Sequence, residues 1–322
     1  MKAPMSATQQ FIVAPEQTNQ TVAALLRLWL PGQSWSQVRR LLETRRVHVN
    51  GELWQDDARR LKTGDKVDLF THSERPRKLV DTIVLRHVDE HLVVVEKPAG
   101  IPTVRHPAEL SWLEERRLKV PTLDDLVLLQ LGAELPKQQH HPKPRLRIVH
   151  RLDKETSGLV VFARTVNAER GLGAQFKQHT VTRRYLALAP GIVVTQTLRS
   201  FLIPDRGDGR RGSTTNEALG KEAITHVEVV ERLPNFTLLS CRLQTGRTHQ
   251  IRIHLSEKGC PVCGEKVYNR ARGGEIIIDK SKTPRLFLHA TELGFVHPIT
   301  NEPMHWEMPL TPDLRECLER LR

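Results

Sequence analysis

The 322-residue sequence predicts an α+β protein, with a large domain on a mixed, mainly antiparallel sheet with flanking helices and a small N-terminal helix-helix-strand domain. Two observations predict this class. Short apolar runs of strand character dominate from residue 82 onward and alternate with few helical stretches, which favours an antiparallel sheet covered by helices. Residues 18–70 carry two amphipathic helical patterns and then strand and turn signals.

The small domain is expected to begin with two helices. Apolar residues at helical spacing between residues 21 and 31 form one stripe, and Pro31-Gly32 ends that helix. Ser34 with Gln37 three positions later has the pattern of a capping box, which opens the second helix. The residues expected to face inward from this second helix are Trp35, Val38, Leu41 and Leu42.

Short strands and a basic face complete the small domain. The run 47–49, the turn pair Asn50-Gly51 and the alternation at Val67 and Leu69 predict strands joined by tight turns. Residues 1–80 hold 13 Lys and Arg against 8 Asp and Glu, and the surplus lies on and after the second helix. This pattern predicts contacts with RNA phosphates, although a solvated helix face has the same composition. The basic residues concerned are Arg39, Arg40, Arg45 and Arg46.

Four segments are predicted along the chain: a flexible N-terminus over 1–17, the small domain over 18–70, a charged linker over 71–81, and the large domain over 82–322. Within the large domain, 136–144 has loop composition. Strands are expected at 92–95, 159–163, 185–189, 223–230, 236–243 and 286–289, and helices at 123–129 and from Pro312 onward, with Thr311 as the cap.

Bulk composition narrows the class of protein. Lys and Arg outnumber Asp and Glu by 49 to 37, and the net charge of +12 favours an extended polyanion such as RNA as partner. No apolar run has the length of a signal peptide core or a membrane span, so we expect a cytoplasmic protein without membrane contacts. Cys260 and Cys263 have zinc-like spacing but no second pair follows, so we expect packed thiols and no metal. A monomer is the default expectation.

Three polar segments differ from ordinary folding patterns. A strand end delivers Arg151 and Asp153 onto a loop, and Tyr185 opens a later strand behind two arginines. Between residues 243 and 255, arginines, histidines and hydroxyls crowd a turn that enters a helix, a density that rarely serves folding because each buried polar group needs a partner. Taken alone, an aspartate among basic residues is more often a structural ion pair, and a strand tyrosine normally packs in the core.

Four motifs occur in a fixed order along the chain. They are Lys-Pro-Ala-Gly at 97–100, His-Arg-Leu-Asp-x-x-Thr-Ser-Gly-Leu at 150–159, Arg-Arg-Tyr at 183–185 and Thr-Gly-Arg-Thr-His-Gln-Ile-Arg-Ile-His-Leu at 245–255. In this order they resemble the RluA-type pseudouridine synthase family, from about residue 82 to residue 310. Residues 18–70 resemble the small RNA-binding module of the ribosomal-protein S-four type. This module occurs in a protein of the small ribosomal subunit and in many RNA-modifying enzymes.

The resemblance implies an isomerase that flips specific uridines out of structured RNA and converts them to pseudouridine. Its partner is expected to be ribosomal or transfer RNA, with ribosomal RNA favoured. It implies that Asp153 is the catalytic aspartate, Tyr185 the active-site tyrosine and Arg252 the partner of the aspartate. It further implies that Arg151 fills the gap left by the flipped nucleotide. No cofactor is expected, because the reaction gains and loses no atoms or electrons. Further substrate-binding residues are expected at His150, Arg247, Thr248, His249 and Gln250.

The chain departs from the family pattern after Gly259, and the run 101–104 and the long segment 103–146 are also unusual. After Gly259 the family usually shows an apolar pair and Gly-Asp before Tyr-Gly, whereas this chain has Cys260-Pro-Val-Cys-Gly-Glu265 and then Tyr268-Asn269. We expect these departures to affect the choice of substrate more than the chemistry.

Two other functions remain open from the sequence. A non-catalytic RNA-binding or ribosome-assembly protein explains the basic charge, but it does not need Asp153, Tyr185 and Arg252 together. A nucleoside or glycoside hydrolase built on Asp153 usually needs a second carboxylate. The candidates for this second carboxylate are Asp205 and Asp208.

Overall fold

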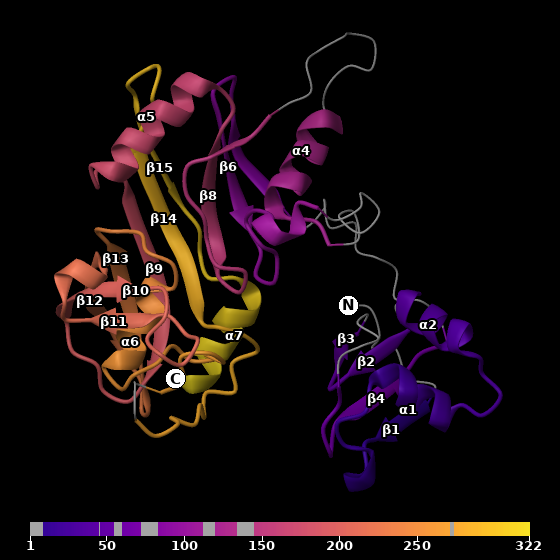
Figure 1. Ribbon diagram of the computed structural model, residues 1–322. Helices are drawn as coiled ribbons and strands as arrows, with labels where there is room; N and C mark the ends of the chain where they lie inside the picture. Colours follow the sequence, from indigo (N-terminus) through magenta and orange to yellow (C-terminus); the bar gives the residue numbers. More distant parts are fainter. Residues whose placement is uncertain are drawn as a thin grey trace. The chain divides into compact units, whose positions relative to one another are not determined.

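The computed structural model describes residues 9–44, 46–54, 60–71, 83–111, 120–133, 145–270 and 274–322. The chain divides into two compact units, Met1–Lys78 and Leu79–Arg322, which Figure 1 colours by position along the sequence. No helix in these described ranges has the length and apolar character that crossing a membrane requires.

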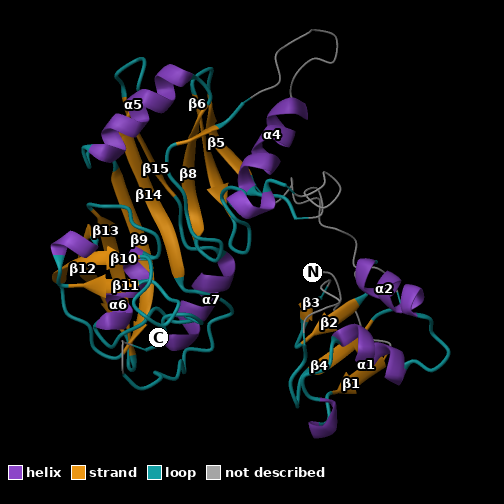
Figure 2. Cartoon of the chain, viewed as in Figure 1, coloured by secondary structure: helices purple, strands orange, loops and turns teal. Residues whose placement is uncertain are grey.

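The first unit packs two helices on a small sheet (Figure 2). Its helices are α1 (Val22–Trp29) and α2 (Trp35–Glu43), after a short 3-10 turn at Pro15–Gln17. The strands are β1 (Gln9–Ile12), β2 (Val47–Val49), β3 (Glu52–Leu53) and β4 (Lys66–Leu69), all antiparallel, in the order β1-β4-β2-β3. The predicted helix-helix-strand order is therefore present.

The predicted capping box of α2 is confirmed. The Ser34 hydroxyl accepts a hydrogen bond from the Gln37 main-chain N–H at 3.2 Å, and the Gln37 side chain accepts one from the Ser34 N–H at 2.7 Å. Val38 and Leu42 are buried as predicted, but Trp35 is 47% exposed and does not face the core. Its ring instead lies 4.7 Å from the guanidinium of Arg27, because a tryptophan in the first turn of a helix can pack along the preceding helix rather than beneath it.

The expectation of a flexible N-terminus over 1–17 is wrong from residue 9 onward. Residues Gln9–Ile12 form β1, which pairs antiparallel with β4, and the Phe11 ring stacks on Trp29 at 4.9 Å. The polar Gln9-Gln10 pair carries no strand signal, and the strand forms because β4 offers it a hydrogen-bonding edge.

The second unit is built on an 11-stranded, mainly antiparallel sheet in the order β11-β10-β12-β13-β9-β14-β8-β6-β5, with β15 on β14 and β7 on β8. Of the strand pairs described, β8 with β14 is parallel and the others are antiparallel. This confirms the mixed α+β class. The strands are β5 (Val84–Val88), β6 (Leu92–Lys97), β7 (Arg147–Ile148), β8 (Ser157–Ala163), β9 (Thr182–Pro190), β10 (Gln196–Ile203), β11 (Gly212–Thr214), β12 (Lys221–Arg232), β13 (Phe236–Leu243), β14 (Leu288–Val296) and β15 (Pro303–Glu307).

Among the described residues of this unit, four helices pack against the sheet. They are α4 (Leu123–Ala133), α5 (Val166–Lys177), α6 (Gln250–Glu257) and α7 (Pro312–Leu321), with 3-10 turns at Pro107–Glu109 and Glu217–Leu219. Helix α5 lies on β7 and β8, and α6 lies on β10 and β12. Alternate residues of β8 point to opposite faces. Val161 therefore packs in one cluster with Leu172 of α5, and Val160 packs in another with Leu126 of α4 and Leu314 of α7. Every residue of β8 is buried, which anchors the loop before it.

The loop before β8, the middle of β9 and the start of α6 meet near the centre of the sheet. Tyr185 of β9 stands opposite Cys241 of β13 on one side and Ala290 of β14 on the other. On β14, Ala290 is also paired with Gly158, near the start of β8. The parallel contact between β8 and β14 therefore brings the motif that contains Asp153 next to the strand that pairs with Tyr185. The segment expected to be loop at 136–144 lies outside the described residues.

Candidate active site

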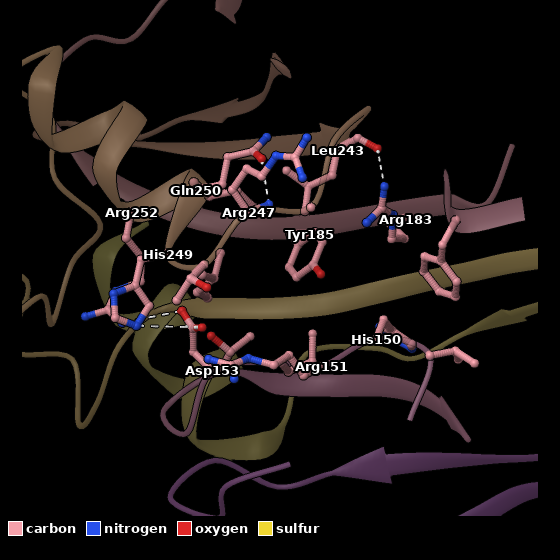
Figure 3. A pocket seen from close by; sticks show the side chains of 18 of the residues that line it. His150, Arg151, Asp153, Arg183, Tyr185, Leu243, Arg247, His249, Gln250 and Arg252 are labelled. Carbon is pink, nitrogen blue, oxygen red and sulfur yellow. Dashed lines mark hydrogen bonds and ion pairs between the residues drawn. The ribbon is translucent and has the colours of Figure 1, made fainter. Parts of the chain in front are cut away.

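A cleft of about 490 Å³ gathers residues from all three of these segments (Figure 3). Nine of the residues predicted for catalysis or substrate binding line it: His150, Arg151, Asp153, Tyr185, Arg247, Thr248, His249, Gln250 and Arg252. Arg39, Arg40 and Arg46 belong to the first unit, and Arg45 lies outside the described residues.

The Asp153 loop is held from below by a buried lysine. Lys97, at the end of β6, is fully buried and donates hydrogen bonds to the carbonyls of Pro98, Lys154 and Thr156 at 2.9, 3.0 and 2.7 Å. Burial lowers the pKa of Lys97 to about 7, although the charges of Glu155 and Asp153 oppose this shift. A side chain with three carbonyl acceptors on this loop fixes the main chain around Asp153.

A threonine secures the other side of the same loop. The Thr103 hydroxyl donates to the Leu152 carbonyl at 2.7 Å and accepts from the Leu152 N–H at 3.0 Å. The main chain next to Asp153 is therefore bonded on both polar groups to a buried side chain. Such a scaffold fixes the position of the carboxylate before the substrate binds. The carboxylate then needs no further ordering during the reaction.

The Asp153 carboxylate lies between two cationic or polar partners. Its Oδ2 is 3.4 Å from Nη1 of Arg252, and its Oδ1 is 3.8 Å from Nε2 of His249. The side chain is 17% exposed, so water reaches it only in part. Both partners come from the start of α6, which places the carboxylate at the wall of the cleft (Figure 3).

Arg252 binds Glu265 more closely than it binds Asp153. Its Nε and Nη2 donate to the two Glu265 oxygens at 2.6 and 2.7 Å, in a bidentate pair. Burial on its own raises the pKa of Glu265, but Arg252 and the main-chain N–H groups of Val267 and Tyr268 outweigh it and hold the pKa below its usual value. The expected pairing with Asp153 is present, and it is the third contact of a guanidinium that Glu265 already orients.

A glycine is required beside Glu265. Gly264 has φ of 82°, and a Cβ there would collide with the carbonyl oxygen of Arg285. A larger residue would therefore clash with the main chain of Arg285 and would adopt a left-handed conformation that favours glycine.

Tyr185 stands in the middle of the cleft wall and is 7% exposed. Burial raises its pKa to about 12, with Arg183 acting in the opposite direction and Asp153 in the same direction. The phenol is therefore neutral at physiological pH and can offer an aromatic face and a hydroxyl.

Gln250 is bonded at every polar position of its side chain. Its Oε1 accepts from the Thr245 hydroxyl at 2.8 Å and from the Arg247 N–H at 3.0 Å. Its Nε2 donates to the Ile224 carbonyl at 3.0 Å and to the Thr225 hydroxyl at 2.9 Å. An amide has two donors and two acceptor positions. This geometry leaves none for RNA and favours a positioning role over the substrate contact expected from the sequence.

His249 precedes α6 in a left-handed conformation, with φ of 59°. Its Nδ1 lies 2.7 Å from the Tyr268 hydroxyl, which turns Nε2 toward Asp153. Burial lowers the pKa of His249, although Asp153 opposes this shift. Tyr268 thus orients a ring that faces the carboxylate.

The remaining predicted residues differ in how they are held. His150 stacks on Phe176 at 4.7 Å, and its Nε2 accepts from the Val161 N–H at 3.0 Å. Burial lowers the pKa of His150 to about 3. Arg247 is exposed and donates from Nε to the Glu222 carbonyl at 3.0 Å. Arg151 is exposed and makes no ion pair within the described part of the chain, and Thr248 is half-buried.

Five residues with a part in this site were absent from the sequence-based list: Lys97, Thr103, Arg183, Glu265 and Tyr268. Glu265 and Tyr268 fall in the stretch that departs from the pattern of the resemblance, so the departure itself was the signal. Arg183 was visible only as a motif residue before Tyr185.

The four cysteines are buried and unbonded to one another. Burial raises the pKa of Cys260 to about 11 and raises that of Cys263 further, so both thiols stay protonated. Among the residues that the structure describes, no group of three or more His, Cys, Asp or Glu is arranged to hold a metal ion.

The fold is shared with proteins of known structure. The solved structure of human RNA pseudouridylate synthase domain containing 4 superposes with a TM-score of 0.58 at 22% identity, covering 76% of this chain and 95% of that one. At this level of identity the likeness shows the fold.

Sequence comparison shows the family. Residues 91–257 match the family model described as RNA pseudouridylate synthase. Curated relatives named ribosomal large subunit pseudouridine synthase D are 34% identical in Zymomonas mobilis, over 84% of this chain and 84% of the relative, and 34% identical in Nitrosomonas europaea, over 94% and 84%. The chain belongs to the RNA pseudouridylate synthase family and is an isomerase.

Proposed function

We propose that this protein isomerises specific uridines of large-subunit ribosomal RNA to pseudouridine, the substrate class in the names of its relatives. One observation carries the proposal for the chemistry. A partly buried carboxylate, Asp153, is fixed by an immobilised loop in a cleft that it shares with Tyr185 and Arg252. The other lining residues are neutral or cationic.

The reaction suits a single carboxylate. The bond from ribose to the uracil nitrogen breaks, the base turns while bound, and a bond to carbon five forms. A carboxylate beside the anomeric carbon acts as nucleophile or stabilises the developing positive charge. The uracil leaves as an anion that stays in the cleft, so a second acid is not required. In this proposal Asp153 supplies the carboxylate.

Arg252 and Tyr185 support that carboxylate in different ways. The guanidinium of Arg252 places a positive charge 3.4 Å from the carboxylate. The raised pKa of Tyr185 favours its neutral form, which stacks on the base or bonds to it through the hydroxyl. Ionised Tyr185 as a general base is the less supported role.

Arg151 is assigned to the RNA stack. Extruding a base costs a few kcal/mol, and a planar guanidinium can stack in the vacated space. Arg151 is exposed at the cleft, two residues before Asp153, and has no described ion-pair partner to hold it back.

The first unit is proposed as an RNA-binding module of the type found in the ribosomal small-subunit protein. Arg39 and Arg40 are exposed on α2, where RNA phosphates can reach them. Arg46 donates from Nε to the Phe70 carbonyl at 2.7 Å. The module would add affinity for structured RNA, and we place the reaction in the cytoplasm. The proposed limits are residues 18–70 for the module, 71–81 for a linker and 82–322 for the catalytic domain.

Large-subunit ribosomal RNA carrying uridine tritiated at carbon five tests the proposal directly. We expect the protein to release the label, because carbon five loses its hydrogen when the new bond forms. A binder without activity would release none, and a hydrolase would leave abasic sugar. Sequencing pseudouridines in cells with and without the gene then locates the target. Loss of a transfer RNA site alone would overturn the assignment to ribosomal RNA.

A further inference from the structure

Arg183 differs from the other buried arginines of the described chain. Four arginines are less than 9% exposed: Arg105, Arg183, Arg206 and Arg252. Three of them bind a carboxylate, in the pairs Arg105 with Asp125, Arg206 with Asp208 and Arg252 with Glu265. No carboxylate within the described ranges pairs with Arg183, which is 7% exposed.

The contacts that Arg183 does make leave its charge uncompensated. Its Nη2 donates to the carbonyls of Leu243 and Gln244 at 3.4 and 3.1 Å, and its guanidinium lies 5.4 Å from the Phe176 ring centroid. Its Nε is buried with no hydrogen-bond acceptor. A buried cation without a counter-charge is destabilising, so a structural role alone does not explain this arginine.

The glycine of the 245–255 motif makes room for this guanidinium. A Cβ on Gly246 would lie 2.6 Å from Nη1 of Arg183. The motif loop therefore passes directly against Arg183, and both residues line the cleft.

The single carboxylate of the cleft lining lies at one end of the cleft, and the guanidinium of Arg183 lies toward the other. Figure 3 shows Asp153, His249 and Arg252 together at one end, Tyr185 between, and Arg183 with His150 toward the other. Asp153 is the one carboxylate among the lining residues, and Lys177 and His179 stand with Arg183 on the α5 to β9 side. A nucleotide bound with its sugar at Asp153 thus meets positive charge beyond Tyr185.

We propose that Arg183 forms an anion subsite for a phosphodiester that adjoins the target uridine. The uracil ring and ribose are neutral before reaction, so the phosphodiester is the anion that the substrate brings to an unpaired guanidinium. Arginine binds phosphate oxygens through charge-assisted hydrogen bonds and remains charged when buried. Occupation of the subsite would anchor the backbone on one side of the flipped base and fix the sugar against Asp153. The inference rests on the proposed function.

Neutral phosphate replacement tests the subsite. RNA hairpins that carry the mapped uridine are made with one methylphosphonate linkage, either directly 5′ of it, directly 3′ of it, or four nucleotides away. Tritium release gives kcat and KM for the wild type, Arg183→Met and the control Arg184→Met. Arg184 is the neighbouring arginine on β9, half-exposed and paired with Glu292.

We expect one adjoining linkage to lower wild-type kcat/KM at least tenfold, mainly through KM, and the distant linkage to have little effect. Arg183→Met should lose a similar factor on normal RNA and show no further loss on the neutral linkage. Arg184→Met should respond to that linkage as the wild type does.

Three results would overturn the subsite. The first is an unchanged wild-type kcat/KM with either adjoining neutral linkage. This result counts whether or not the Arg183→Met variant folds. The second is an Arg183→Met enzyme that still loses the full factor on the neutral linkage. The third is an Arg183→Met enzyme whose loss on normal RNA is confined to kcat. That result would assign Arg183 to the departing uracil anion. If the wild type releases no tritium from the normal hairpin, the proposed function fails instead.

Discussion

Replacing Glu265 by Gln leaves the buried guanidinium of Arg252 without its main counter-charge. The two side chains are 1% and 8% exposed and are joined by two hydrogen bonds of 2.6 and 2.7 Å. Breaking a buried pair of this kind costs about 3–5 kcal/mol. Gln can still accept from the Val267 and Tyr268 N–H groups, so we expect a value near the lower end, about 3 kcal/mol.

Urea unfolding at pH 7 measures the effect in a double-mutant cycle with Arg252→Gln. The Glu265→Gln variant leaves Arg252 with the contact to Asp153 alone, and the Arg252→Gln variant leaves Glu265 without a cation. The double variant has neither buried charge, so we expect a coupling energy of about 2–3 kcal/mol. The pair Arg199 with Glu222, whose side chains are 68% and 38% exposed, serves as the control. Its coupling should stay below about 1 kcal/mol. Equal coupling energies for the two pairs would refute the claim that Glu265 compensates Arg252.

The same variants differ in their pH dependence. In the wild type the pKa of Glu265 is lower in the folded state than the usual 4.5, so its stabilisation is present above pH 4.5 and is lost as the pH falls through the folded pKa. In Arg252→Gln, only the main-chain N–H groups of Val267 and Tyr268 still oppose burial, and the pKa of Glu265 rises. Compared with the double variant, Arg252→Gln should therefore lose stability as the pH rises from 4.5 toward 7. A loss on acidification instead would contradict the assigned cause.

Three further predictions follow from the cleft. The pKa of Lys97 is about 7 in the folded state and 10.5 when free. The unfolding free energy of the wild type should therefore rise relative to that of Lys97→Met between pH 7 and 10, by up to about 1.4 kcal/mol per pH unit. Urea titrations measure this difference, and a difference that stays constant with pH would contradict the prediction. Arg151→Ala should raise KM for a structured hairpin and leave KM unchanged for a short single strand with the same uridine, since the strand has no stack to fill; equal changes would exclude the stacking role. The pH profile of kcat should show no basic limb from Tyr185 below pH 9, since its pKa is about 12, and a limb that disappears in Tyr185→Phe would show that the tyrosine ionises during turnover.

Local patterns of the sequence predicted the parts of the fold that depend on near neighbours. The capping box of Ser34 and Gln37 lies within one helical turn and was found in the sequence alone. The strand, loop and strand around Asp153 were equally visible, because the apolar run of β8 is buried on both faces. The exposed position of Trp35 was not visible in the sequence, because a helical stripe does not show whether its first residue reaches the core.

Contacts between distant segments could not be read in the same way. β1 forms against β4, more than fifty positions later, although half of its own residues are glutamines. Glu265 was read as a departure from the family pattern, and only the structure shows that it is the main partner of Arg252. Arg183 is distinguished by lacking a carboxylate in the described chain, and a sequence does not reveal the absence of a tertiary partner.

Turnover by Asp153→Asn tests the central role of the carboxylate most directly. The substitution keeps the shape of the side chain and removes its charge, and Glu155→Gln, which removes an equal charge from an exposed position of the same loop, is the matched control. With tritiated ribosomal RNA, we expect Asp153→Asn to fold and bind RNA but to release less than a few per cent of the wild-type label, while Glu155→Gln stays near the wild type. Substantial release by a folded Asp153→Asn protein would contradict the assignment of the chemistry to this carboxylate.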